Sequence, residues 1–150
     1  MGENNTMIKE ALVSGNYLEA INKAKDMKLE DLSGSLLELA FENEEIVAYT
    51  FVTFLIFQLG ENSDLHCLAS SLLSHPLCHI DGAYKSALFH SRRALELSPN
   101  NISLKENLLF FHTIPDRLIS KDEAILLAKE VLQNDPTSAI AKEVLEIYGY

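Results

Sequence analysis

The feature that most constrains the fold is a twenty-residue stretch, Gly82–Asn101, with the pattern of one amphipathic helix that has a defined end. Pro99 ends this helix, because proline lacks the backbone N–H of an intrahelical bond and restricts the residue before it. Asn100 or Asn101 then caps the next helix. Small side chains dominate the apolar face, so a neighbouring helix is expected to approach closely. That face, marked by steps of three and four residues, comprises Ala83, Ala87, Leu88, Ser91, Ala94 and Leu95.

A second copy of this pattern indicates a repeat. Gly15–Ile21 has the same arrangement as Gly82–Leu88, where the helix described above begins. The equivalent residues Ala20 and Ala87 lie 67 residues apart, close to two units of about 34 residues. Pro99 and Pro136 lie 37 residues apart, so one unit is slightly longer. Units of this length are helical hairpins that stack on their neighbours to bury their apolar faces.

This pattern resembles the second helix and exit turn of a tetratricopeptide repeat. The resemblance implies an all-α fold of about nine helices, in which antiparallel hairpins stack as a right-handed superhelix over a single domain, residues 1–150. Hairpins are expected at about 4–27, 29–59, 62–97 and 101–134, with a capping helix at 136–148. The pair at 29–59 carries no signature residues and is placed by position alone. The matched signature positions are Gly82, Tyr84, Ala87, Leu88, Ala94, Leu95 and Pro99.

Capping residues predict where individual helices begin. Asn43 is expected to cap a helix over Glu44–Leu59, which is apolar nearly all round. A helix of that kind is normally covered on several sides, so we expect it to be the packing centre of the N-terminal half. The helix that includes Gly15–Ile21 is expected to continue to about Met27. Other expected caps are one of Asn62, Ser63 and Asp64, one of Asn100 and Asn101, and Asp81, Ser120 and Asp135.

Composition favours a protein of the cytoplasm that does not enter a membrane. The N-terminal residues are polar, unlike the apolar core of a signal peptide. The uncharged and mostly apolar run Ile46–Gly60 has fifteen residues, whereas a spanning helix needs about 20. Cys67 and Cys78 do not suggest a disulfide framework, so free thiols are the simpler interpretation.

The net charge of −10 is concentrated in the middle third of the chain. Leu29–Asp81 holds nine acidic residues and no lysine or arginine, whereas the flanking thirds are nearly balanced. This pattern argues against a nucleic-acid partner, because neutralising phosphates requires clustered basic side chains. It favours a basic protein or peptide as partner. The alternative is that the acidic surface only keeps the protein soluble.

Five potential metal ligands lie within fourteen residues. Zinc prefers four such ligands in a tetrahedron, and a zinc site is one interpretation of this cluster. The spacing fits no compact finger pattern, because the first two are adjacent and point about 100° apart on a helix. The alternative is a buried Cys67, a loop Cys78 and surface histidines. The five residues are His66, Cys67, His75, Cys78 and His79.

No pattern in the sequence indicates an enzyme. The carboxylate pairs Glu44/Glu45 and Asp122/Glu123 stand at expected helix starts, where acidic residues favour the helix dipole. There is no glycine-rich phosphate loop and no metalloprotease His-Glu motif. We therefore expect no catalytic residues and no cofactor.

The resemblance also implies where a partner binds. In tetratricopeptide proteins the ligand usually lies in a concave groove lined by the first helix of each pair. Some members of the family hold a C-terminal carboxylate there with several basic residues, but the two central first helices of this chain have none. The expected partner-binding residues are instead Glu30, Asp31, Glu38, Glu42, Glu45, Asp64 and His66.

These observations predict a non-catalytic module that binds a basic protein or peptide through an acidic surface. A narrower version, based on size and charge, is an antidote of the immunity-protein type that covers the cleft of a toxin such as a nuclease. Two alternatives are a zinc-binding protein or enzyme that uses the His66–His79 cluster, and a scaffold that self-associates through its open repeat ends.

Overall fold

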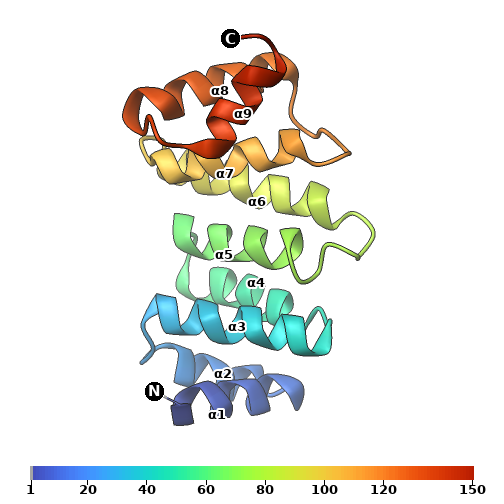
Figure 1. Ribbon diagram of the computed structural model, residues 1–150. Coiled ribbons are helices and arrows are strands. Elements are labelled where there is room, and N and C mark those ends of the chain that lie inside the picture. Colours follow the sequence, from blue (N-terminus) through green and yellow to red (C-terminus); the bar gives the residue numbers. More distant parts are fainter. Residues whose placement is uncertain (1) are drawn as a thin grey trace.

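The computed structural model describes residues 2–150, with side chains from Asn5 onward. Successive helices reverse direction and stack into an elongated array with the two termini at opposite ends (Figure 1). This arrangement confirms the predicted all-α fold of stacked helical hairpins. Over the described range the chain forms nine α-helices and no strand: α1 Gly2–Val13, α2 Tyr17–Ala24, α3 Leu29–Asn43, α4 Val47–Leu59, α5 Ser63–Ser74, α6 Ala83–Leu97, α7 Ile102–Thr113, α8 Lys121–Asn134 and α9 Ala139–Ile147.

The closest helix pair is α5 with α6, near the middle of the array. Ala87, Ser91 and Ala94 of α6 are buried, and Ser91 Oγ lies 2.7 Å from Ser70 Oγ of α5. Side chains of this size let the two backbones approach, as the small face of Gly82–Asn101 predicts. Helices that come first in their hairpins also pack on one another along the array: α1 packs on α3, α3 on α5, and α7 on the last helix, α9.

Two apolar cores lie on either side of this central pair. The N-terminal core joins α1 to α5 and includes Ile8, Leu36 and Phe51. The C-terminal core is formed mainly by α6 to α9, around residues such as Leu109 and Val131. Several polar side chains are buried where α5 meets α6, so the two cores are joined through a polar layer.

The helix expected to be covered on several sides is buried on one face only. In α4 the buried residues Ala48, Phe51, Val52 and Leu55 follow steps of three and four. Phe57, on another face of the same helix, is 83% exposed. The apolar character of α4 therefore does not mean that the helix is surrounded, because as the second helix of its hairpin it packs mainly on α5 and α3.

Some predicted helix ends differ from the observed ones. Asn43 does not cap α4, because it is the last residue of α3, and Glu44 ends α3 in a left-handed conformation with φ of 53°. The residue before α6 is Gly82 rather than Asp81, and its φ of 83° suits glycine. The second helix ends at Ala24 rather than Met27.

The last helix begins at Ala139 rather than Pro136. Ser138 is its cap and accepts a hydrogen bond from the Ala141 backbone N–H. Asp135 instead accepts hydrogen bonds from Thr137, a local turn that competes with helix formation. The caps predicted at Asn62, Asn101 and Ser120 are confirmed, since each side chain accepts a bond from the backbone N–H three residues later.

Candidate functional site

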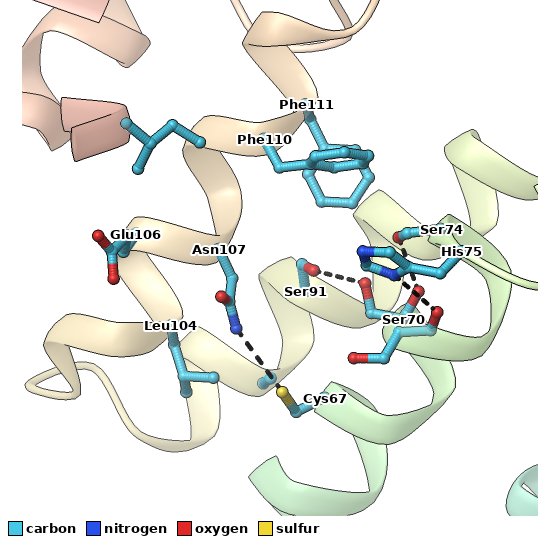
Figure 2. A pocket seen from close by; sticks show the side chains of 13 residues that line it. Cys67, Ser70, Ser74, His75, Ser91, Leu104, Glu106, Asn107, Phe110 and Phe111 are labelled. Carbon is cyan, nitrogen blue, oxygen red and sulfur yellow. Dashed lines mark hydrogen bonds between the residues drawn. The ribbon is translucent and has the colours of Figure 1, made fainter. Parts of the chain in front are cut away.

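A hollow in the surface, here called the α5–α7 pocket, opens between α5 and α7 and has a volume of about 310 Å³. It lies where two first helices are separated, because α5 and α7 do not pack together as α3 packs on α5 or α7 on α9 (Figure 2). The pocket is lined by Cys67, Ser70, Ser71, Ser74, His75, Ser91, Ala94, Leu104, Glu106, Asn107, Phe110, Phe111 and Ile140.

Small side chains on α5 explain why the pocket stays open. Cys67, Ser70, Ser71 and Ser74 share one face at steps of three and four residues, and all four side chains are small, with Cys67 bonded to α7 through the longer Asn107 side chain. The opposite wall is built from larger residues of α7, and Ile140 of α9 adds to the lining. The helices are held apart by their packing on α6 and α9, so the small α5 face becomes a cavity wall.

Most polar hydrogens at the pocket are committed within the protein. Ser74 Oγ donates to the Ser70 carbonyl at 2.7 Å. The Asn107 amide nitrogen lies 3.7 Å from Cys67 Sγ and donates to it. His75 Nδ1 lies 3.0 Å from the Ser71 carbonyl oxygen. A carbonyl can only accept, so Nδ1 carries the proton, and in the neutral ring Nε2 is an acceptor.

One carboxylate, one imidazole (His75) and no lysine or arginine line the α5–α7 pocket. Glu106 is half-buried, and its Oε1 accepts a hydrogen bond from Ser138. The preceding residue, Lys105, is held by Glu130 of α8, with 2.7 Å between the charged atoms. The neighbouring lysine is therefore engaged elsewhere, and the pocket carries a negative charge when Glu106 is ionised.

Beside this pocket, a chain of hydrogen bonds crosses the polar layer between the two cores. Tyr49 Oη lies 3.0 Å from His90 Nε2, His90 Nδ1 lies 2.8 Å from His66 Nδ1, and His66 Nε2 lies 3.0 Å from Glu61 Oε1. We call these four residues the buried histidine chain. The His66 and His90 residues are only 3% and 5% exposed.

The outer end of the buried histidine chain is fixed by an ion pair. Arg93 makes two hydrogen bonds to Glu61, at 2.7 and 2.6 Å. These bonds, with a smaller effect from His66, lower the pKa of Glu61 to about 2. Arg93 also pairs with Glu96 at 2.8 Å, and the two carboxylates raise the pKa of the guanidinium. Glu61 is therefore an ionised acceptor at neutral pH.

The Glu61 carboxylate sets the donor-to-acceptor direction of the hydrogen bonds along the whole buried histidine chain. A carboxylate can only accept, so His66 Nε2 carries a proton. When His66 is neutral, its Nδ1 accepts from His90 Nδ1–H, and His90 Nε2 then accepts from the Tyr49 hydroxyl. Burial, and secondly the nearby His66, lower the pKa of His90 to about 4. Burial also raises the pKa of Tyr49.

The thiol at the pocket is not activated as a nucleophile. Burial, and secondly Asp64, raise the pKa of Cys67, whereas the bond from Asn107 has the opposite, smaller effect. Reactive cysteines need a lowered pKa, usually from a neighbouring cation. The chemistry that the described geometry supports is binding through hydrogen bonds and charge.

The five predicted metal ligands are not brought together. His66 belongs to the buried histidine chain, Cys67 contacts Asn107, and His75 stacks on Phe110 with 5.8 Å between ring centroids. Cys78 and His79 are exposed in the segment between α5 and α6. In residues 2–150 no group of three or more His, Cys, Asp or Glu side chains is placed to hold a metal ion.

The predicted acidic residues fall into two sets. Lys9 pairs with Glu38 at 2.7 Å and with Glu42 at 3.4 Å, so basic residues from outside the middle third neutralise part of its charge. His66 is buried and does not reach the surface. No ion pair joins the remaining predicted residues within the described part of the chain: Glu30 and Asp31 in the first turn of α3, Glu45 before α4, and Asp64 in the first turn of α5.

Sequence reasoning missed Tyr49, His90 and Glu106. One signal was present, because His66, Ser70 and Ser74 form a polar stripe at steps of four on an otherwise apolar helix. A polar stripe that faces a core needs partners on the neighbouring helix. Which residues supply them depends on how α5 and α6 pack, which the periodicity does not reveal.

Comparisons with known proteins do not identify a family. A scan against protein-family models, a search of curated proteins and a search of solved structures each found no match. Across residues 2–150, none of the helices combines the length and apolar character needed to cross a bilayer.

Proposed function

We propose that this chain is a non-catalytic protein-interaction module, similar to a tetratricopeptide repeat domain, that binds a segment of a basic protein. The observation that carries the proposal is the α5–α7 pocket, an opening between two first helices with apolar and polar side chains in its lining and Glu106 as its one carboxylate. A partner segment seated there is held by side chains from four different helices, α5, α6, α7 and α9.

Long-range attraction supports the choice of a basic partner. The chain carries a net charge of −10. Glu30, Asp31 and Asp64 lie in the first turns of α3 and α5, which run in the same direction along the array (Figure 1). No base among the described residues pairs with these carboxylates, so they are available to steer a cationic surface. The same charge and size support the narrower version of the proposal, an antidote that covers the cleft of a basic toxin such as a nuclease.

The test is capture of partners from the native lysate on immobilised protein, with elution in a salt gradient and identification by mass. Ser71→Phe places a ring in the pocket, and Ser86→Phe, at an exposed position of α6, is the matched control. We expect a basic protein that leaves at moderate salt, because the attraction is screened. It should bind the control and fail to bind Ser71→Phe.

Equal capture by both variants would show that the pocket is not the binding site. Binding that salt does not weaken would refute the electrostatic part of the proposal. A second pair of variants separates the acidic residues: Glu30→Gln with Asp31→Asn should weaken capture more than Glu38→Gln with Glu42→Gln, because Lys9 already pairs with Glu38 and Glu42 and offsets one of their two charges. No specific contact in the described structure favours the zinc-binding or the self-associating alternative.

A further inference from the structure

The polar atoms left over in the α5–α7 pocket are mainly acceptors. The His75 Nδ1–H, the Ser74 hydroxyl and one N–H of Asn107 are directed at acceptors within the chain, whereas the second Asn107 N–H and the Ser71 hydroxyl remain as donors. Glu106 Oε1 accepts from Ser138, and no partner from the described residues occupies its Oε2. The Asn107 side-chain carbonyl is also left to accept. A guest that satisfies these atoms must bring several donors.

Charge selects among donor-rich guests. A cation in the pocket meets the Glu106 carboxylate without a competing lysine or arginine in the lining, because Lys105 is bound to Glu130. An anion in the same place meets that carboxylate and finds no cation. The Glu106 carboxylate therefore attracts cationic side chains and repels anionic ones.

Shape favours a guanidinium over an ammonium. Glu106 and Asn107 follow one another on α7, so their side chains leave the helix about 100° apart, and in Figure 2 the Asn107 amide is directed at Cys67 while the Glu106 carboxylate points another way. A planar guanidinium presents its five donors in a rigid fork that matches the two oxygens of one carboxylate, whereas an ammonium is a compact point charge. Leu104 and Phe111 line the same cavity and offer apolar surface for an aliphatic stem. A volume of about 310 Å³ suits one side chain.

We propose that Glu106 binds the guanidinium of one arginine in the partner segment, with the arginine stem against Leu104 and Phe111. This inference rests on the proposed function and adds the residue type that the pocket selects. Arginine then anchors the segment, and the surrounding acidic surface contributes mainly to the association rate.

The test uses N-acetyl-arginine amide as probe, titrated into isotopically labelled protein and followed by NMR. N-acetyl-citrulline amide is the matched probe, because it keeps the planar shape and loses the charge. We expect millimolar binding with shifts confined to residues that line the pocket. Losing one charged hydrogen-bond partner should weaken binding by about tenfold or more, both for citrulline and for Glu106→Gln. Glu143→Gln, which removes an exposed carboxylate of α9, should bind the arginine probe like the wild type.

Equal binding of both probes to the wild type would overturn the inference, whatever the folding of the variant. Shifts outside the pocket, or no effect of Glu106→Gln, would overturn it as well. Failure of this inference is distinguishable from failure of the proposed function. If Ser71→Phe abolishes capture of a partner while the arginine probe does not bind, the arginine subsite is wrong and the docking site stands. If the probe binds while no partner depends on Ser71, the subsite stands and the proposed function fails.

Discussion

His90 should make the stability of the protein depend on pH between the pKa of its imidazole in the folded state and that in the unfolded chain. The residue is 5% exposed and bonded to Tyr49 and His66. Its pKa is lowered to about 4 in the folded state, first by burial and then by His66. In the unfolded chain a histidine has a pKa of about 6.5. As pH falls below that value, the unfolded chain takes up a proton that folded His90 refuses, so stability decreases.

The size of the effect follows from the difference between the two pKa values. The full difference corresponds to about 3 kcal/mol, reached when pH falls to the folded pKa. Between pH 7 and pH 5 the loss is about 2 kcal/mol. Glu61 does not contribute in this interval, because its stabilisation is lost only as pH falls below its ordinary range towards its folded pKa of about 2. A loss of about 2 kcal/mol is measurable for a domain whose total stability is about 5–15 kcal/mol.

The assay is urea unfolding at pH 7, 6 and 5 for the wild type and for His90→Gln. Glutamine keeps one acceptor and one donor for the two neighbours of His90 but does not titrate in this range. The free energy of unfolding of the wild type should fall by about 2 kcal/mol more than that of the variant between pH 7 and pH 5. His79→Gln, at an exposed position, should follow the wild type. Parallel pH profiles for the wild type and His90→Gln would refute the reasoning.

Three further predictions concern packing, reactivity and capping. Phe51→Ala should lower the unfolding free energy by about 3–5 kcal/mol, because Phe51 is fully buried. Phe57→Ala, at an exposed position of the same helix, should change it by less than about 0.5 kcal/mol. Equal effects of the two variants in urea unfolding would contradict the one-sided burial of α4. A thiol reagent should modify the exposed Cys78 before Cys67, whose pKa is raised by burial, as single-cysteine variants would show. Ser120→Ala should cost about 1 kcal/mol through the lost bond to the Glu123 N–H, and no change in melting temperature would disprove it.

The helical fold was predictable because its signals are local. The small face of Gly82–Asn101 predicted a close helix neighbour, and α5 packs on that face closely enough for Ser70 and Ser91 to form a hydrogen bond. Asn62, Asn101 and Ser120 cap their helices through bonds that span only three residues. The failures at Asn43, Asp81 and Asp135 are also local, because in each case a different residue nearby takes the terminal conformation.

The site was much less predictable, because its residues meet across the chain. The sequence shows an acidic middle third, but only the fold shows that Lys9 pairs with Glu38 and Glu42 from 29 or more positions away in the chain. Likewise, the five candidate metal ligands are near in sequence, yet helix geometry and packing direct them to different neighbours. Proximity along the chain does not decide which side chains share a site.

By itself the sequence determined the helices, their order and the faces that they bury, since periodicity and capping depend on residues a few positions apart. Only the tertiary structure decided that α5 and α7 are held apart around a pocket, and that His66 meets His90 between the cores. The physical reason is that these features depend on the relative placement of packed helices. The volumes of all the side chains at each interface set that placement together, and no short segment contains that information.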